Sequence, residues 1–224
     1  MAHIGETGYQ NSVHMLQYMY MNLATPKEVG QLPHILHARR NLKLKLSHRQ
    51  VEILTGAVLG DGYIYPSGKV QLEHSAKGKN YLLWKFHELK NLAYEKLGSV
   101  ARIDKRNGKK YVSNRFWLRQ YFAAWRRYFY RGKRKIFPIG LKLTPLSLAV
   151  WYMDDGCYSD KICTISTDNF SVRSLRRIKR ELKYLGLNAY IRSNGKIGIS
   201  ARSHEKFFTL IRPYIHESMK YKLP

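Results

Sequence analysis

The sequence has only two cysteines, Cys157 and Cys163, in 224 residues. They lack the spacing of a zinc site and are too few for a disulfide framework, so a reduced compartment is expected. No apolar run is long enough to span a membrane, and no secretory signal is visible at Met1. The sequence therefore predicts a protein that stays inside the cell and is not secreted.

Acidic residues are scarce as well. The chain has 15 Asp and Glu residues against 40 Lys and Arg residues, which gives a formal net charge of +25. So much positive charge repels itself unless a polyanion is the partner, and this favours nucleic acid. A membrane surface is a weaker candidate, because no basic amphipathic stretch stands out. With 44% hydrophobic residues and 17 tyrosines, the chain is globular, and its length permits one large domain or two small ones.

Two apolar segments, residues 54–62 and 148–156, end on the same pair of residues, an acid followed by glycine. Aligning the two glycines pairs Asp61 with Asp155. Each segment has the length of a helix. The pattern therefore predicts a duplicated unit that carries one carboxylate at the end of a helix in each copy.

The end of a helix carries partial negative charge on its unpaired carbonyl groups, so a carboxylate there needs a cation beside it. Glycine after the acid supplies a left-handed or tight exit. Gly56 and Gly60 lie on one helical face and would let a second backbone approach closely. If the two helices pack side by side, Asp61 and Asp155 converge at one end. The carbonyls of Gly60 and Asp154 are then plausible further ligands in an oxygen-rich site that suits Mg²⁺.

The rest of the chain also repeats, since each copy reads helix, hairpin, helix, hairpin, helix. Residues 98–103 match 186–191 in spacing, and an Asn-Gly pair follows at 107–108 and at 194–195. Asn-Gly between alternating runs predicts a hairpin turn in which both residues have positive φ. The middle helix of the first copy is expected from about Asn80 to a stop at Gly98. Its apolar stripe would contain Leu82, Phe86, Leu89, Ala93 and Leu97.

The chain divides into four predicted segments. Residues 1–45 form an N-terminal extension, 46–130 the first repeat, 131–143 a basic linker and 144–224 the second repeat. Ser47 and Thr144-Pro145 are typical starts for the two acid-bearing helices. The extension, with a short helix expected around Val13, Leu16 and Leu23, either follows a phosphate backbone or is a flexible arm.

These paired motifs resemble the signature helices of the LAGLIDADG homing endonucleases, in particular the single-chain, intron-encoded type with both motifs in one polypeptide. Residues 143–156 and the terminal 221–224 are similar to a yeast mitochondrial intron endonuclease of that type. The likeness covers about residues 46–224. It departs from the family pattern where Asp154 replaces the small residue found before the catalytic acid, and the bulky Trp151 and Tyr152 exclude a symmetric helix interface.

The resemblance implies an α+β fold of two pseudo-symmetric αββαββα repeats, each with an antiparallel sheet shaped as a saddle, and with the signature helices packed at the repeat interface. It implies a monomer that makes a staggered double-strand cut in a long DNA target, with Asp61 and Asp155 as catalytic acids holding Mg²⁺ or Mn²⁺. Members of the family have a basic residue near each scissile phosphate, and the resemblance assigns this role to Lys135 and Lys222. A simple contact with phosphate, without a catalytic role, is the alternative for each lysine. An organelle (mitochondrion or chloroplast) or a prokaryotic cytoplasm is the implied location.

Residues that alternate along the hairpins are candidates for DNA contact. Arg and Lys suit guanine edges or phosphates, and Asn and Gln suit adenine. In the last hairpin, one face is expected to be apolar, with Ala189, Ile191, Ile197, Ile199 and Ala201. The candidates are Tyr63, Tyr65, Lys69, Gln71, Arg102, Arg106, Lys109, Arg115, Trp117, Arg119, Asn188, Tyr190, Arg192, Lys196, Ser200 and Arg202. For any single one, an ordinary solvated sheet face is the alternative.

Two other functions fit the same composition. An intron maturase of the same family would bind its host intron RNA, because phosphate binding does not separate RNA from DNA. A transcription factor on the same fold would not need paired acids, so it ranks last. The two intact Asp-Gly ends favour the nuclease.

Overall fold

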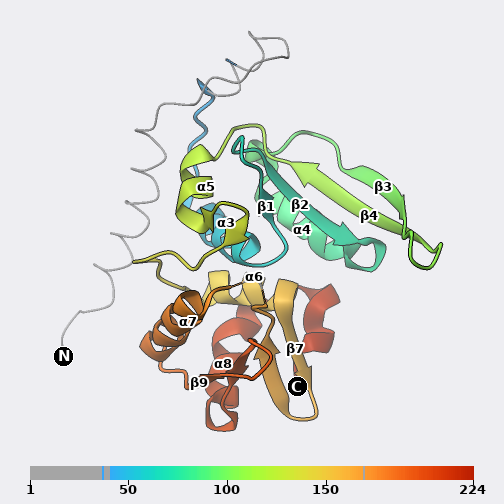
Figure 1. Ribbon diagram of the computed structural model, residues 1–224. Coiled ribbons are helices and arrows are strands. Elements are labelled where there is room, and N and C mark those ends of the chain that lie inside the picture. The colour runs from blue at the N-terminus through green and yellow to red at the C-terminus, as the bar shows by residue number, and fades with distance from the viewer. Residues whose placement is uncertain (1–36, 38–40, 169) are drawn as a thin grey trace.

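The structure is a computed structural model that describes residue 37, residues 41–168 and residues 170–224 (Figure 1). The helix predicted around Val13 and Leu23 lies outside these residues. Among the residues described, no helix is both long enough and apolar enough to cross a membrane.

Both halves of the chain contain the same series of elements (Figure 1). The first half contains α3 (His48–Leu59), β1 (Tyr63–Ile64), β2 (Val70–Ser75), α4 (Lys79–Glu88), β3 (Gly98–Ile103), β4 (Lys110–Trp117) and α5 (Ala123–Phe129). The second contains α6 (Pro145–Asp155), β7 (Gly156–Ser159), β8 (Ile162–Ile165), α7 (Val172–Tyr184), β9 (Ala189–Ile191), β10 (Ile197–Ile199) and α8 (His204–Ile211). Their antiparallel sheets have the equivalent orders β1-β2-β4-β3 and β7-β8-β10-β9. The predicted α+β fold of two αββαββα repeats is confirmed.

The segment between the halves contains regular structure. It contains a small hairpin of β5 (Tyr130–Arg131) and β6 (Arg134–Lys135). This hairpin is what carries Lys135, one of the predicted catalytic lysines.

The signature helices α3 and α6 begin as predicted. The Ser47 hydroxyl accepts from the Gln50 amide at 3.2 Å, and the Gln50 side chain accepts from the Ser47 amide at 3.1 Å. Thr144 and Ser147 make the same reciprocal pair at the start of α6, where Pro145 is the first helical residue. These capping boxes satisfy amide groups that have no partner inside the helix.

The two signature helices pack side by side between the halves of the molecule (Figure 1). A Cβ added to Gly56 would lie 2.7 Å from the Cβ of Val150, and one added to Gly60 would lie 2.5 Å from the Cβ of Asp154. Both distances are too short for real atoms. The two glycines therefore allow the close approach that the sequence predicted.

The bulky residues of α6 explain why this interface is not symmetric. Trp151 and Tyr152 are fully buried. The Trp151 ring lies 6.5 Å from the ring of Phe137, and the Tyr152 ring lies 5.2 Å from that of Phe207. These aromatic contacts fill the core around α6 in positions where α3 has small residues.

Of the two exits predicted after each acid, left-handed or tight, the left-handed one does not occur. Neither Gly62 nor Gly156 has a positive φ. Crowding is the reason for glycine at both places. A Cβ on Gly62 would lie 2.6 Å from the Ala57 carbonyl oxygen, and one on Gly156 would overlap the Tyr152 ring.

The predicted extent of the middle helix in the first repeat is also wrong. Helix α4 ends at Glu88, a short 3-10 turn follows at Lys90–Leu92, and Gly98 begins β3 rather than ending a helix. Ala93 is extended and pairs with Leu118 beyond the end of β4. The apolar spacing of residues 93–98 favoured a helix, but in the structure these residues lead into or join the sheet.

The Asn-Gly turns differ from the prediction in one respect. Gly108 and Gly195 have φ of +66° and +79°, but neither Asn107 nor Asn194 has a positive φ. Each turn is longer than two residues; in the first, the Asp104 carbonyl accepts from the Gly108 amide at 2.8 Å. Glycine alone takes the left-handed position in such a turn.

The last hairpin is shorter than predicted. Strand β10 ends at Ile199, and Ala201 and Arg202 belong to a 3-10 turn, Ala201–Ser203. Ala201 is exposed, and Ile191 is 40% exposed, so neither lies on a buried apolar face. Arg202 accordingly is not part of the strand surface that was predicted to contact DNA.

Contrary to expectation, the chain contains a basic amphipathic helix. Helix α7 has six Lys and Arg residues in its 13 positions, while Leu175, Ile178 and Leu182 on its other side are buried. The helix is amphipathic and strongly basic.

Candidate active site

Asp61 lies just beyond the end of α3, at the interface with the second repeat. Its amide donates to Asp154 Oδ2 at 3.2 Å, and its carboxylate Oδ2 lies 3.4 Å from His74 Nδ1 on β2. The Asp61 side chain is 45% exposed. The Asp61 backbone is therefore held by the second repeat, while its carboxylate contacts the first repeat and is partly open to solvent.

Asp155 is the last residue of α6. Its Oδ2 accepts from Trp151 Nε1 at 3.2 Å, and its backbone carbonyl accepts from the Ser166 amide at 2.9 Å. The buried indole and the first hairpin of the second repeat thus fix the position of this carboxylate.

Electrostatics indicate that the two acids share one region. Burial, followed by the charge of the neighbouring Asp154 carboxylate, raises the pKa of Asp61 to about 6. Burial likewise raises the pKa of Asp155 to about 7, and the next largest cause is the charge of Asp61. Each ionised carboxylate is thus disfavoured by the other acids around it. A divalent cation would relieve this repulsion.

A buried ion pair lies directly behind Asp61. Lys85 Nζ on α4 donates to Asp154 Oδ1 on α6 at 2.6 Å, and both side chains are fully buried. His74 Nε2 lies 3.0 Å from Lys85 Nζ. Burial, followed by the charge of Lys85, lowers the pKa of His74 to about 4. Lys85 and Asp154 therefore form a charged contact between repeats that supports the Asp61 backbone.

Lys85 and His74 were not predicted as site residues. The apolar spacing of α4 and the alternation of β2 indicate a helix around Lys85 and a strand around His74. No signal in the sequence shows that either side chain lies near Asp154. One ligand atom each from Asp61, His74 and Asp154 lie within 4.8 Å of one another, which makes this trio a possible cation site among the residues described. The Asp154 side chain was not expected there, because only its backbone carbonyl was proposed as a ligand.

The two predicted lysines lie at the ends of the signature helices. Lys135 Nζ donates to the Gly60 carbonyl. Lys222 Nζ donates to the carbonyls of Met153 at 2.6 Å and Asp154 at 3.2 Å. Burial lowers the pKa of both lysines, and the nearby acids oppose this effect. The lysines therefore supply the cation that a carboxylate at a helix end requires, and they occupy the carbonyls proposed as metal ligands.

A pocket of about 300 Å³ joins the two acids. Asp61 and Asp155 line it together with Lys135 and with Asp168, which follows β8. Sequence reasoning missed Asp168, because the loop after β8 has no motif of its own. The pocket brings three carboxylates and one lysine to the helix ends.

The sequence model of the LAGLIDADG DNA endonuclease family matches residues 51–207, a range that includes Asp61 and Asp155. The chain belongs to the LAGLIDADG DNA endonuclease family. The predicted family resemblance is confirmed.

The chain is also similar to a solved structure and to curated proteins. The structure of the homing endonuclease I-WcaI bound to its DNA recognition sequence is 25% identical, with a TM-score of 0.73, covering 88% of this chain and 95% of that chain. Protein RecA of Mycolicibacterium flavescens is 30% identical over 80% of this chain and 47% of its own length. Cytochrome b mRNA maturase bI2 of Debaryomyces hansenii is 27% identical over 82% of this chain and 76% of its own length. The chain spans about half the length of the first curated relatives that it matches.

The first LAGLIDADG repeat brings several predicted DNA-contact residues together on its sheet. The Tyr65 ring lies 4.7 Å from that of Tyr63 and 5.4 Å from that of Trp117, and Lys69 Nζ lies 4.0 Å above the Trp117 ring. The Tyr65 hydroxyl donates to Gln71 at 3.1 Å. These five residues form one connected aromatic and polar surface.

Other predicted contacts of the first repeat have protein partners. Arg102 pairs with Glu73, which lowers the pKa of that carboxyl, and Arg106 pairs with Asp104 at 2.8 Å. Arg115 lies 5.6 Å from the Trp117 ring. Lys109 is exposed in the turn after Asp104.

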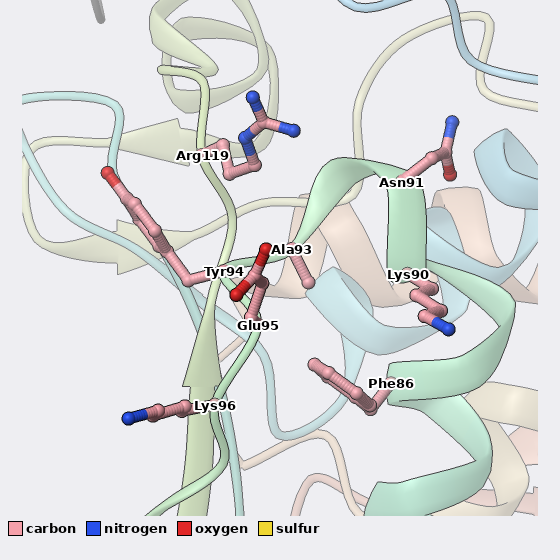
Figure 2. Close-up of a pocket in the computed structure, with 8 residues that line it drawn as sticks. All are labelled: Phe86, Lys90, Asn91, Ala93, Tyr94, Glu95, Lys96 and Arg119. Carbon is pink, nitrogen blue, oxygen red and sulfur yellow. The ribbon is translucent and has the colours of Figure 1, made fainter.

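Arg119 lies apart from that surface. It lines a pocket of about 1040 Å³ with Phe86, Tyr94 and Lys96, between the end of α4 and the chain leading to β3 (Figure 2). This pocket is larger than the one that joins the acids, yet it contains neither Asp61 nor Asp155.

The second repeat presents a smaller strand surface. Tyr190 is 41% exposed, and its ring covers Gly198 so closely that a Cβ there would lie 2.5 Å from Tyr190 Cζ. The Arg192 amide donates to the Lys196 carbonyl at 2.9 Å, and the Ser200 amide donates to the Asn188 carbonyl at 2.9 Å. Apart from Arg202, the predicted contacts of this repeat thus lie on or beside the last hairpin.

Proposed function

We propose that the chain is a site-specific DNA endonuclease that makes a staggered double-strand cut by divalent-metal-dependent phosphodiester hydrolysis. The observation that carries the proposal is the meeting of Asp61 and Asp155 in one pocket at the ends of two packed helices. The I-WcaI structure, which is bound to its DNA recognition sequence, supports DNA as the partner of this chain.

The donor set fits Mg²⁺ or Mn²⁺. Asp61 and Asp155 offer carboxylate oxygens, and the pKa of each is raised first by burial and then by the charge of a neighbouring acid. Hard oxygen ligands are those that Mg²⁺ prefers. When bound, such ions activate water and stabilise the leaving oxygen. The two acids hold the ions, and the α3–α6 contact fixes the spacing between the acids.

We assign Lys135 and Lys222 a role at the scissile phosphates. In the free protein each donates to a carbonyl at a helix end. A scissile phosphate entering beside Asp61 and Asp155 competes with those carbonyls, because a charged acceptor forms the stronger hydrogen bond. Each lysine would then stabilise negative charge on the phosphate as it grows in the transition state.

Each repeat is assigned to one half of the DNA target. We assign residues 46–130 and 144–224 to one half-site each, with residues 131–143 as the connection and 1–45 as an extension. The sheet of each repeat contacts one half of the target, so a single chain acts as a monomer and cuts one strand with each acid. The exposed aromatic and polar surface around Tyr65 and Trp117 is the first-repeat part of this contact.

The test is digestion of a pooled library of long candidate target DNAs, with magnesium and with a chelator, followed by sequencing of the ends. We expect specific, magnesium-dependent double-strand ends with a fixed stagger. Specific binding without any cut, in a library that covers the bound sites, would refute the endonuclease.

A second candidate is an RNA-binding intron maturase. The similarity to a protein named as a cytochrome b mRNA maturase favours it specifically. It does not require either acid, so splicing of a bound intron RNA should persist in Asp61→Asn. The two functions are compatible in one chain.

A further inference from the structure

Helix α7 presents five exposed basic side chains on its outer face. They are Arg173, Arg176, Lys179, Arg180 and Lys183. The one acid of the helix, Glu181, is 5% exposed and lies 3.6 Å from Lys142. Glu181 also feels the charge of Arg180, but the helix has no second carboxylate to compensate the other exposed charges.

Four of these residues line a groove of about 260 Å³ between α7 and the start of β9. The α7 groove is defined by Arg176, Lys179, Arg180 and Lys183, with Leu187, Asn188 and Ala189 on the other side. Among the residues described, none of the four basic side chains has an ion pair. From the first to the last they span about 10 Å along the helix, enough to reach more than one phosphate.

This charge is unfavourable for the helix itself. Each of the four residues has another of them three or four positions away, so they are neighbours on the helix surface, where like charges destabilise. The fold does not require them. The equivalent helix of the first repeat, α4, has only two lysines, and one of these, Lys85, is buried. Duplication thus provides an internal comparison, and the basic face is specific to the second repeat.

The outer face of α7 and the exposed strand surface around Tyr190 lie on opposite sides of the second sheet, and of the predicted DNA contacts only Asn188 lines the α7 groove. Leu175, Ile178 and Leu182 pack in the core with Ile197 and Ile199. On the opposite face of the sheet, Tyr190 is exposed. A straight duplex on the Tyr190 side of the sheet would therefore not cover the outer face of α7, since DNA resists sharp bending over a short length.

An aromatic ring stands beside the basic residues. Tyr184, the last residue of α7, is 68% exposed, and Lys142 Nζ lies 4.2 Å from the centre of its ring. Exposed aromatic rings next to basic residues stack on unpaired bases, which folded RNA supplies in its loops and duplex DNA does not.

We propose that the outer face of α7 binds a folded RNA. The four basic residues of the α7 groove contact phosphate groups, and Tyr184 stacks on an unpaired base. This inference rests on the second candidate function, for which it names the binding surface, and it does not depend on DNA cleavage.

The test uses the full chain and a fluorescein-labelled RNA hairpin with an unpaired purine loop. The α7 variant combines Arg176→Gln, Lys179→Gln, Arg180→Gln and Lys183→Gln. The matched control removes the same charge from exposed lysines of the first repeat, with Lys77→Gln, Lys79→Gln, Lys90→Gln and Lys96→Gln. A DNA hairpin of the same sequence and a fully paired RNA are the comparison probes, and affinity is measured over a range of salt concentrations.

We expect the α7 variant to bind the RNA hairpin about tenfold more weakly or worse, and its salt slope to fall by roughly 3. The control should change both quantities much less, and binding of target DNA by the α7 variant should match that of the wild type. Tyr184→Ala should weaken binding of the looped hairpin but not of the paired RNA.

Three results would overturn the inference. Equal losses in the two charge variants would indicate attraction to net charge alone. Equally tight and equally α7-dependent binding of the DNA hairpin would remove the preference for RNA. Displacement of the RNA by duplex DNA would place it on the strand surface. A chain that shows the expected RNA pattern but never cuts DNA would refute the endonuclease and leave this inference standing.

Discussion

Replacing Lys85 by methionine removes one half of the buried ion pair behind Asp61. Methionine has a similar length, so the volume is nearly kept. The Asp154 carboxylate, which is fully buried and accepts from Lys85 at 2.6 Å, would then lack its partner. Removing one member of a buried pair destabilises a protein by about 3–5 kcal/mol, because an uncompensated charge is left behind. For a chain of this size the loss corresponds to a fall in Tm of about 6–20 °C.

The measurement is urea unfolding of the DNA-free protein at pH 7.5 in chelator, with Lys85→Met, Asp154→Asn and the double variant compared with the wild type. The double variant removes both charges, and the amide that Asp154→Asn introduces keeps an oxygen that can accept from the backbone N–H of Asp61. We therefore expect it to recover at least half of the free energy of unfolding lost in Lys85→Met. A loss below about 1 kcal/mol in the single variant, the size typical of an exposed pair, would refute the reasoning that the contact is buried and desolvated.

Other predictions concern the acids, a lysine and the helix contact. Asp155→Asn should abolish cleavage while DNA binding is kept, whereas Asp154→Asn should reduce it less; the reverse order in single-turnover assays would contradict the assignment of the ligand. Lys222→Met should slow cleavage at saturating DNA, and an unchanged rate would end its catalytic role. Gly56→Val should lower the free energy of unfolding by about 1–3 kcal/mol, since the added atoms overlap α6; denaturant titration would show no loss if the helices stood further apart. The raised pKa of Asp61 means that the folded protein binds its proton more tightly than the unfolded chain does, so its contribution to stability falls as the pH rises toward 6. In chelator, Asp61→Asn should therefore gain Tm relative to the wild type between pH 4 and pH 7.5, and a difference that does not depend on pH would count against this.

Local signals were enough to predict the helices that position the site. Ser47 and Thr144 have the chemistry of helix caps, and they begin α3 and α6. The spacing of Gly56 and Gly60 indicated the close helix contact. The spacing of the hairpins gave the order of elements in both repeats. All of these depend on residues near one another in sequence.

Tertiary partners were not predictable in this way. In the sequence, Lys85 cannot be distinguished from the many other basic residues. Only the fold shows that it contacts Asp154 of the other repeat. Ala93 continues a helical stripe but pairs with Leu118, because a neighbouring strand offers hydrogen bonds that a local pattern cannot reveal. Arg202 follows the alternation of β10, yet the strand has already ended.

The central claim is that Asp61 and Asp155 together hold the divalent cations at which DNA is cut. Crystals of the chain bound to its target DNA with Mn²⁺ would test it most directly, because anomalous scattering locates the metal. We expect manganese between the two signature helices, in contact with oxygens of both Asp61 and Asp155 and of the scissile phosphates. Manganese bound by His74 and Asp154 without Asp155, or no metal at either acid, would contradict the account.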